Sequence, residues 1–536
     1  MKARAIMVLG TSSHVGKSLL TAALCRIFAQ QGHRVAPFKS QNMSLNSAAT
    51  VEGLEIGRAQ ALQAEAAGVA ASVHMNPILI KPSSDNSSQV VVCGKIWGRV
   101  TAADYHQRRV EELLPVVRES YEALASQYDV IVLEGAGSPA EINLKRHDIA
   151  NMRMAEMADA RCLLVGDIDR GGVFASLLGT LELLDPEERE LIRGFAINKF
   201  RGDASLLEPG IQMIEERIQR PCIGVVPYLH SLMLDEEDSL GLPVTTQTQW
   251  TLDTAFDKTP DRPLRIAVVA LPSFSNFTDF DSLRAEPTVS VLFCQTAEAI
   301  AQADVVILPG SKQTVDDLLW MRERSLDVAV QQYARTGLVV GICGGMQMLG
   351  KTITDPLGME RDGSAAGLGL LPIETIMHAD KVTRNVTGNM VARTLFGQPV
   401  EDSLISGYEI HIGQTVYQAG AAHFAVLSSG LRPGYQNDGC ISPDTRVFGT
   451  YLHGLFDDDG FRHQFLRAAK AFHRLAAPAE LHLWKHLREE SLNRLAREVE
   501  KALDMKTIFG WVGLAYKDIH STSENVVRSQ IEGILR

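Results

Sequence analysis

One cysteine in the chain has the sequence surroundings of a catalytic nucleophile. Cys343 stands between small residues in the run Gly341-Ile-Cys-Gly-Gly345, directly after the apolar stretch Leu338–Val340. A strand, a sharp turn of small residues and a helix together project a nucleophilic side chain. The helix start would lower the pKa of the thiol, and the backbone N–H of Gly344 could stabilise an oxyanion. The pattern favours nucleophilic catalysis over a structural thiol.

A histidine farther along the chain is the best candidate for the base that such a thiol needs. His453 follows the apolar run that begins at Val447, within Tyr451-Leu-His-Gly-Leu455. One histidine among fifteen carries little weight alone, but it gains weight beside the cysteine turn. Leu308-Pro-Gly310-Ser311 is a second tight loop after an apolar run. Its N–H groups, that of Gly310 included, could complete an oxyanion hole, the alternative being a plain strand-to-helix turn.

A separate phosphate-binding site is indicated near the start of the chain. Gly10-Thr-Ser-Ser-His-Val-Gly16-Lys17-Ser18 joins an apolar run to an amphipathic stretch. Gly10, Thr11 and Gly16 would let the backbone wrap around a phosphate, with the N–H groups of a helix start facing the anion. Lys17 could reach the terminal phosphates of ATP, and the Ser18 hydroxyl could coordinate Mg²⁺. Five residues separate the two glycines, where the usual phosphate loop has four.

Three polar residues after other apolar runs would surround the same phosphates. Glu134 follows the run Val130–Leu133, and an acid at the carboxyl end of a parallel strand could bind Mg²⁺. Asn198 closes another run, where its amide could read the base of the nucleotide. Lys39 follows the run Arg34–Phe38 and could hold a phosphate or a substrate carboxylate. For each of the three, an ordinary loop or surface residue is the alternative.

These residues need strands and helices to position them, and the apolar pattern supplies both. Through residues 1–230, short apolar runs alternate with helical patterns such as Ser18–Gln31 and Tyr105–Gln127. The runs predict strands at Ala5–Leu9, Arg34–Phe38, Val130–Leu133, Cys162–Gly166, Gly194–Asn198 and Cys222–Val226. Such alternation predicts a parallel sheet covered on both faces, as in an α/β protein.

The pattern breaks at residues 231–262, an acidic, polar and proline-containing stretch that reads as a linker. A second α/β domain is expected over 263–475. Its strands are predicted at Arg265–Leu271, Val305–Leu308, Val339–Ile342 and Val447–Tyr451. Farther on, apolar residues from Leu481 to Leu503 mark one face of a long helix, so 476–536 is expected to be a helical extension.

Composition excludes several classes of protein. The 536 residues are 45% apolar and 22% charged, as in ordinary globular domains. The net charge of −12 argues against a surface that binds nucleic acid uniformly. No apolar run is long enough to predict a membrane span. The seven cysteines are widely spaced, without zinc-ligand or disulfide patterning, which favours a reduced, cytoplasmic protein.

The second block resembles class I glutamine amidotransferase domains, with Cys343 as nucleophile and His453 as base. In that family a glutamate usually stands two positions after the histidine and orients it, whereas this chain has Leu455. The departure is typical of the branch that contains cobyric acid synthases and cobyrinic acid diamide synthases. It implies that free ammonia competes well as a nitrogen source. The nearby acids Asp457–Asp459 are not expected to take the orienting role.

The first block resembles the cobyric acid synthase family in particular, with an ATPase domain similar to dethiobiotin synthetase. The phrases that match run over residues 37–46, 55–61, 134–144, 167–174 and 197–203, and 407–413 fits in the second block. Both domains stand in the expected order, and the likeness covers residues 5–475. The fold implied is two doubly wound α/β domains, one like a P-loop NTPase and one like a class I glutaminase, which is flavodoxin-like.

The resemblance implies a reaction of cobalamin biosynthesis. ATP and glutamine would be used to amidate the b, d, e and g carboxylates of adenosylcobyrinic acid a,c-diamide, through acyl phosphates and ammonia released from glutamine. Basic residues of the first block, among them Lys39, Lys199 and Arg201, would face the corrinoid carboxylates. ATP and Mg²⁺ would be required, without a tightly bound organic cofactor, a nucleic acid or a membrane.

Three other functions compete with this one. The nearest is the a,c-diamide synthase. Two phrases favour the cobyric acid synthase family over it, Gln41-Asn-Met and Ser138-Pro-Ala-Glu-Ile-Asn. Another is a glutamine-dependent amidase of a different carboxylate. The third is a ParA/MinD-like ATPase switch with an inactive second domain, which the intact Cys343 and His453 disfavour. The sequence leaves the oligomeric state, the order of amidation and the ammonia path open.

Overall fold

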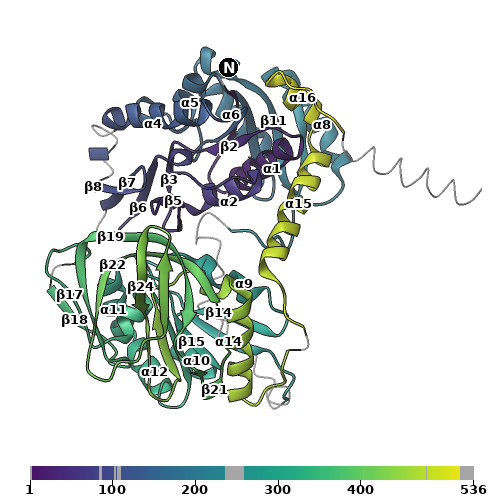
Figure 1. Cartoon of the computed structure of the whole chain (residues 1–536). Helices are drawn as coiled ribbons and strands as arrows, with labels where there is room; N and C mark the ends of the chain where they lie inside the picture. Colours follow the sequence, from purple (N-terminus) through teal and green to yellow (C-terminus); the bar gives the residue numbers. More distant parts are fainter. Residues whose placement is uncertain are drawn as a thin grey trace, which may run out of the picture.

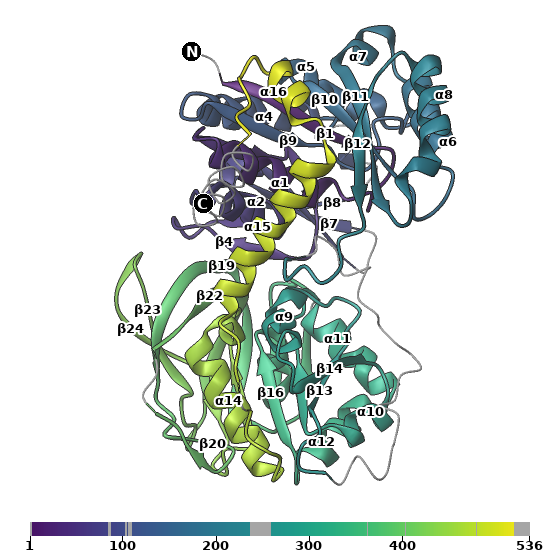
Figure 2. The ribbon, with the colours of Figure 1, turned by 90° about the vertical axis from the view of Figure 1, so that its right-hand side faces the viewer.

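The computed structural model describes residues 3–518, apart from 84–86, 102–103, 106–109, 236–258, 362, 402–403 and 479. Two α/β domains are stacked one on the other, and a long helix near the C-terminus runs from the second domain back along the first (Figure 1, Figure 2). Most of the expected linker lies outside the described residues. Among the described helices, none is long and apolar enough to cross a bilayer.

The N-terminal domain is built on a six-stranded parallel sheet whose order is β12-β11-β10-β1-β9-β2. Its strands are β1 (Arg4–Gly10), β2 (Val35–Phe38), β9 (Val130–Glu134), β10 (Arg161–Asp167), β11 (Ile192–Phe200) and β12 (Cys222–Pro227). Each contains or overlaps a run that the sequence predicts as a strand. The sheet reverses its order beside β1, so ligands are expected at the carboxyl ends of β1 and its neighbours.

Helices cover both faces of this sheet because successive strand residues point to opposite sides. Met7 and Leu9 pack toward α4 (Val110–Ala125), α5 (Met152–Ala158), α6 (Val173–Glu182) and α8 (Glu208–Ile218), with α7 (Pro186–Leu191) at the edge. Ile6 and Val8 pack toward α1 (Lys17–Gln30) and α2 (Arg58–Ala67) on the other face. The expected helix Tyr105–Gln127 overlaps α4, although residues 106–109 are not described.

The long C-terminal helix belongs to the core of the first domain. α15 (Trp484–Ala502) buries Leu492, Leu495 and Val499 against α1 and β12, and α16 (Met505–Trp511) follows it. The expected helix is therefore present, and it completes one hydrophobic core of the first domain. Residues 519–536 of the expected extension lie outside the described residues.

Short strands inserted between β2 and α4 were not expected from the sequence. β3 (Gln41–Met43), β6 (Ile78–Pro82), β7 (Ser87–Val92) and β8 (Lys95–Thr101) form one small sheet, and β4 (Ser47–Ala49) pairs with β5 (Glu55–Gly57). Figure 1 shows them on the side of the first domain that faces the second. They bring polar residues of the first domain to the interface.

The second domain has a sheet of order β14-β13-β15-β16-β26-β25, parallel except at β25. Its strands are β13 (Leu264–Val269), β14 (Val289–Cys294), β15 (Val305–Leu308), β16 (Leu338–Ile342), β25 (Cys440–Ile441) and β26 (Val447–Thr450). Its helices are α9 (Asp281–Arg284), α10 (Ala297–Gln302), α11 (Thr314–Glu323), α12 (Leu326–Tyr333), α13 (Gly344–Leu349) and α14 (Asp459–Phe472). The two doubly wound α/β domains are confirmed.

A second, largely antiparallel sheet in this domain was also missed. It contains β17 (Thr352–Asp355), β18 (Gly363–Ala366), β19 (Ile373–Met390), β22 (Leu404–Tyr417), β23 (Ala425–Ser429) and β24 (Arg432–Asp438), beside the short pair β20 (Thr394–Leu395) and β21 (Gln398–Pro399). The long strands β19 and β22 reach the first domain, where Asn385 Nδ2 donates to the carbonyl of Thr50 at 3.1 Å. This sheet therefore helps to join the two domains.

Candidate active sites

Cys343 lies at the sharp turn that its neighbours predict. It follows β16 directly and stands before α13, with φ of 50° and ψ of −108°, a backbone conformation that L-residues rarely adopt. Small neighbours are required here, because a Cβ on Gly345 would lie 1.9 Å from the carbonyl oxygen of Leu308. The thiol is buried, and its Sγ lies 3.6 Å from the carbonyl oxygen of Ile410.

His453 faces this thiol and is held by an acid that sequence reasoning missed. Its Nδ1 lies 2.7 Å from Oδ2 of Asp279, whose Oδ1 accepts a hydrogen bond from the Gly454 N–H at 3.0 Å. With Nδ1 engaged, Nε2 is the ring nitrogen left for Cys343, whose side chain is close enough to His453 to affect its pKa. Burial alone would lower the pKa of His453, but the charges of Asp279 and the Cys343 thiolate raise it to about 10. The three side chains form a Cys–His–Asp triad.

Asp279 comes from a different part of the chain than the family pattern suggests. It lies in the 3₁₀ turn Phe277–Phe280 beyond β13, while Leu455, where a glutamate would stand, is buried among apolar side chains. The expectation that Asp457–Asp459 do not orient the histidine agrees with this geometry. One sequence signal was available, since Asp279 follows β13, a strand of the same parallel sheet that carries Cys343 at the end of β16.

The two loops proposed for the oxyanion hole pack against each other beside the triad. A Cβ on Gly310 would lie 3.0 Å from Cε1 of His453, and one on Gly344 would lie 2.9 Å from the backbone nitrogen of Ser311. Gly344 opens α13, where the first N–H groups have no acceptor within the helix. Gly344 directly follows Cys343 and Gly310 lies beside His453, so both stay the predicted oxyanion donors.

A pocket opens at the thiol and is shared between the domains. The second domain contributes most of its wall, while Lys81 and Gln89 come from β6 and β7 of the first domain. The remaining lining residues are Ser275, Asn276, Ser311, Lys312, Thr314, Cys343, Gln347, Glu360, Lys381, Ile410, His411 and Ile412. Gln347, Lys312, Glu360 and Lys81 were not singled out for this site from the sequence.

In the first domain, the loop from Gly10 to Gly16 has the geometry of a phosphate cradle. Gly16 has φ of 98°, and a Cβ there would lie 2.2 Å from Nδ2 of Asn198. Lys17 folds over the loop, with Nζ 2.9 Å from the carbonyl oxygens of both Ser12 and Gly137. The predicted Lys17 thus stands at the loop that would hold the phosphates.

Glu134 joins several of the predicted residues into one buried cluster. Its Oε1 accepts hydrogen bonds from Ser18 Oγ at 2.8 Å and from Lys39 Nζ at 2.9 Å, and its Oε2 accepts one from Gln63 Nε2 at 2.6 Å. Hydroxyl and carboxylate oxygens suit Mg²⁺, which is usually held by one or two protein ligands and substrate phosphates. Among the described residues, no group of three or more His, Cys, Asp or Glu is arranged to hold a metal ion.

The remaining predicted residues lie at the carboxyl end of β11. Asn198 donates from Nδ2 to the carbonyl of Val15 at 2.8 Å, so that it supports the phosphate loop. Lys199 forms an ion pair with Asp167 at 2.9 Å. Arg201 is more exposed, with its guanidinium 3.9 Å over the ring of Tyr228. Asp167, buried at the end of β10, is an acid that sequence reasoning left without a role.

Contacts across the interface reach His453, the predicted base. Arg58, at the start of α2 in the first domain, donates a hydrogen bond to the Tyr408 hydroxyl and lies 4.9 Å over that ring. The Tyr408 ring stacks on His453, with centroids 5.3 Å apart and planes at 18°. Asn276 accepts a hydrogen bond from the backbone N–H of Ser47 at 2.9 Å, and its Nδ2 lies 3.5 Å from His453 Nε2.

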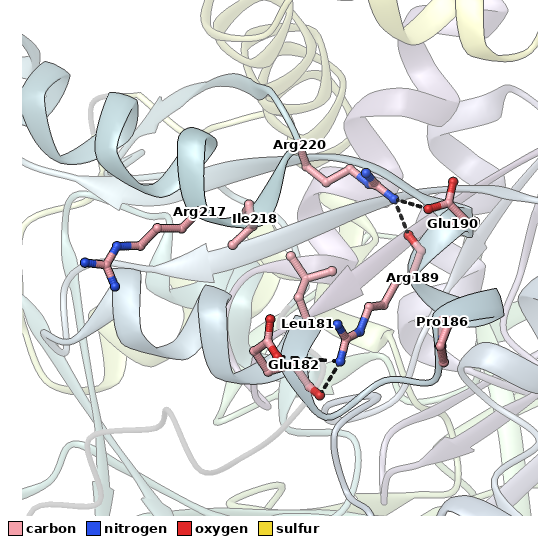
Figure 3. Close-up of a pocket in the computed structure, with 8 residues that line it drawn as sticks. All are labelled: Leu181, Glu182, Pro186, Arg189, Glu190, Arg217, Ile218 and Arg220. Atoms are coloured by element: carbon pink, nitrogen blue, oxygen red, sulfur yellow. Dashed lines mark hydrogen bonds and ion pairs between the residues drawn. The ribbon is translucent and has the colours of Figure 1, made fainter.

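A further hollow lies far from both sites, between α6, α7 and α8 (Figure 3). Two of its arginines form ion pairs, Arg220 with Glu190 at 2.9 Å and Arg189 with Glu182 at 3.6 Å. Neither a nucleophile nor a phosphate loop borders it.

Comparison with known proteins now decides the family. Residues 6–241 match the CobQ/CobB/MinD/ParA nucleotide binding domain, and residues 265–461 match the CobB/CobQ-like glutamine amidotransferase domain. A cobyric acid synthase from Moorella thermoacetica is 46% identical over 96% of this chain and 98% of its own length. Another from Syntrophobacter fumaroxidans is 46% identical over 96% of this chain and 99% of its own.

The chain belongs to the cobyric acid synthase family. It is therefore an amidotransferase with a nucleotide-binding domain, as the sequence resemblance implied. The alternative of a ParA/MinD-like switch with an inactive second domain is disfavoured, because Cys343, His453 and Asp279 are all present and lie together. In this member of the cobyric acid synthase family, the acid in contact with the histidine is Asp279.

Proposed function

We propose that the protein uses ATP and glutamine to convert the b, d, e and g carboxylates of adenosylcobyrinic acid a,c-diamide to amides, giving adenosylcobyric acid. The observation that carries the proposal is the shared pocket, in which Lys81 and Gln89 of the ATPase domain border the Cys343 site. The ammonia-releasing site thus opens at the domain that would activate carboxylates. The unpaired state of all seven cysteines fits a reducing compartment such as the cytoplasm.

Glutamine hydrolysis follows from the triad. The Cys343 thiolate attacks the side-chain amide carbon of glutamine, and the N–H groups of Gly310 and Gly344 stabilise the oxyanion that forms. The protonated His453, held by Asp279, gives its proton to the leaving nitrogen, which departs as ammonia. Water then hydrolyses the thioester, releasing glutamate and restoring the thiol.

Carboxylate activation takes place at the phosphate loop. A carboxylate resists attack by ammonia because it is negatively charged and has no good leaving group. Attack of a carboxylate oxygen on the γ-phosphorus of ATP breaks the bond to ADP and gives an acyl phosphate, from which ammonia displaces phosphate. Lys17 stabilises the charge of the transferred phosphoryl group, and Lys39, Lys199 and Arg201 are candidates for holding carboxylates near it.

Ser18 and Glu134 are the residues that would hold Mg²⁺ together with the phosphates. The ion would neutralise charge on the transferred phosphoryl group. Gln63 and Lys39 already orient the Glu134 carboxylate, which keeps an oxygen beside the Ser18 hydroxyl.

The experiment that tests the proposal measures product stoichiometry. The protein is incubated with ATP, Mg²⁺, glutamine and the corrinoid diamide, and ADP, glutamate and corrinoid amides are counted. One ADP and one glutamate per amide formed are expected. Activity on cobyrinic acid at its a and c positions, with none on the diamide, would instead identify an a,c-diamide synthase.

A further inference from the structure

The pocket at Cys343 carries an excess of positive charge. Lys81, Lys312 and Lys381 line it, with Glu360 as the carboxylate among its lining residues. Glu55 lies in the ATPase domain with its side chain fully buried, and it forms ion pairs with both Lys81 and Lys381. The buried Glu55 carboxylate is therefore the ion-pair partner of two of the three lysines.

Lys312 is the lysine without such a partner. Within the described parts of the chain, its ammonium group forms neither an ion pair nor a hydrogen bond. Burial lowers the pKa of Lys312. The charges of Glu360 and Glu55 oppose this effect, whereas those of Lys381 and Arg99 lower the pKa further. Glu360 is itself held in place, since its Oε2 accepts a hydrogen bond from the Thr314 N–H at 2.6 Å. A bound anion would relieve the repulsion around Lys312.

Lys312 lies in the same loop as Gly310, close to the end of the pocket where Cys343 would react. It comes two residues after Gly310, the proposed oxyanion donor. The loop is fixed on both sides, because the Lys312 N–H donates to the carbonyl of Ser273 at 2.9 Å and the Gly310 carbonyl accepts from the Ser275 N–H at 3.0 Å. One rigid loop thus presents a backbone donor beside the triad and a cation in the same pocket.

We propose that Lys312 binds the α-carboxylate of glutamine and so selects an α-amino acid amide as the nitrogen donor. This inference rests on the proposed glutaminase reaction. Glutamine must place its side-chain amide at Cys343, so its α-carboxylate lies farther along the pocket, where a cation without a protein partner is available. Free ammonia needs no such contact and is not affected.

The test compares two reagents that modify Cys343 in the intact protein. 6-Diazo-5-oxo-L-norleucine carries the α-amino and α-carboxylate groups of glutamine, whereas iodoacetamide carries neither. Rates of Cys343 modification are measured by peptide mass spectrometry in the wild type, Lys312→Met, Lys312→Arg and the control Lys351→Met. Lys351 is exposed in the same domain and does not line the pocket.

Removal of a cation that faces a desolvated carboxylate is expected to slow modification by the diazo analogue by about 30-fold or more. Iodoacetamide modification and ammonia-dependent amidation should stay close to wild type, which shows that Lys312→Met folds. Lys312→Arg should recover most of the rate, and Lys351→Met should change neither rate. The KM for glutamine should rise in Lys312→Met while kcat is largely kept.

Two results would overturn the inference. Unchanged modification by the diazo analogue in Lys312→Met would show that Lys312 does not bind the carboxylate. An equal loss of modification rate with both reagents would show that Lys312 affects the reactivity of the Cys343 thiol and not the binding of the carboxylate. Failure of the proposed function is distinguishable, because the wild-type Cys343 would then resist the diazo analogue while still reacting with iodoacetamide.

Discussion

Nδ1 of His453 lies 2.7 Å from Oδ2 of Asp279, and both side chains are almost completely buried. The pair places a carboxylate at the histidine in a chain that lacks the glutamate expected two positions after it. Asp279 fixes the ring with Nε2 toward Cys343 and favours the imidazolium form. This relationship leads to the first prediction.

Asp279→Asn should impair glutamine hydrolysis by about 100-fold, within the range that positioned acid–base groups supply. Removal of the carboxylate charge lowers the pKa of His453 from about 10, so at neutral pH less imidazolium is present to stabilise the thiolate. The rate of Cys343 alkylation by iodoacetamide, followed against pH, should therefore shift to higher pH. An unchanged pH profile would contradict the role of Asp279.

Cys343→Ala should separate the two nitrogen sources. The variant should make no amide from glutamine, since no other described cysteine stands in a strand–turn–helix elbow with a histidine beside it. Amidation with ammonium chloride should continue, because the phosphate loop is untouched. Glutamate release and corrinoid amidation are measured in parallel, and continued use of glutamine by the variant would show that another residue is the nucleophile.

Lys17→Met should stop both routes to the amide. Lys17 stands over the phosphate loop, with Nζ 2.9 Å from two of its surrounding carbonyls, and would stabilise the transferred phosphoryl group. Amidation from glutamine or ammonia should fall by about 100-fold or more, as for other donors to transition-state charge. Lys95→Met, at an exposed position of β8, is the matched control. Ammonia-dependent amidation at the wild-type rate in Lys17→Met would refute the assignment.

Arg58→Met should weaken the glutaminase although Arg58 lies in the other domain. Its guanidinium holds Tyr408 against His453. Loss of a charged hydrogen bond in a buried site should lower the rate of glutamine hydrolysis by about tenfold or more. Glutamine-dependent amidation should drop, while ammonia-dependent amidation should fall far less. The exposed Arg34→Met serves as the control. Equal losses by both routes would mean that Arg58 supports the ATPase domain instead.

The sequence allowed the parallel strands to be predicted, and it singled out Cys343 and His453 because each follows the end of an apolar run. Gly10, Glu134, Asn198 and Cys343 all stand at or just after the carboxyl end of a buried strand. The antiparallel sheet was missed for a physical reason. Its long strand β19 alternates buried and exposed residues at its ends but is polar through the middle, where it approaches the other domain.

Asp279 and Lys312 were harder to foresee. Asp279 reaches His453 only because strands β13, β15, β16 and β26 bring distant loops to one edge of the sheet. Lys312 becomes notable once the pocket shows which lysines already share Glu55, a residue of the other domain. Contacts that depend on the docking of two domains leave no local pattern in either one.

The most direct test of the central claim is the mass of the corrinoid after reaction with ATP, Mg²⁺ and glutamine. The wild type should convert the diamide through partly amidated forms to a product in which four carboxyl groups have exchanged OH for NH₂. Cys343→Ala should reach the same product only when ammonium is supplied. Consumption of ATP and glutamine with an unchanged corrinoid mass would contradict the account.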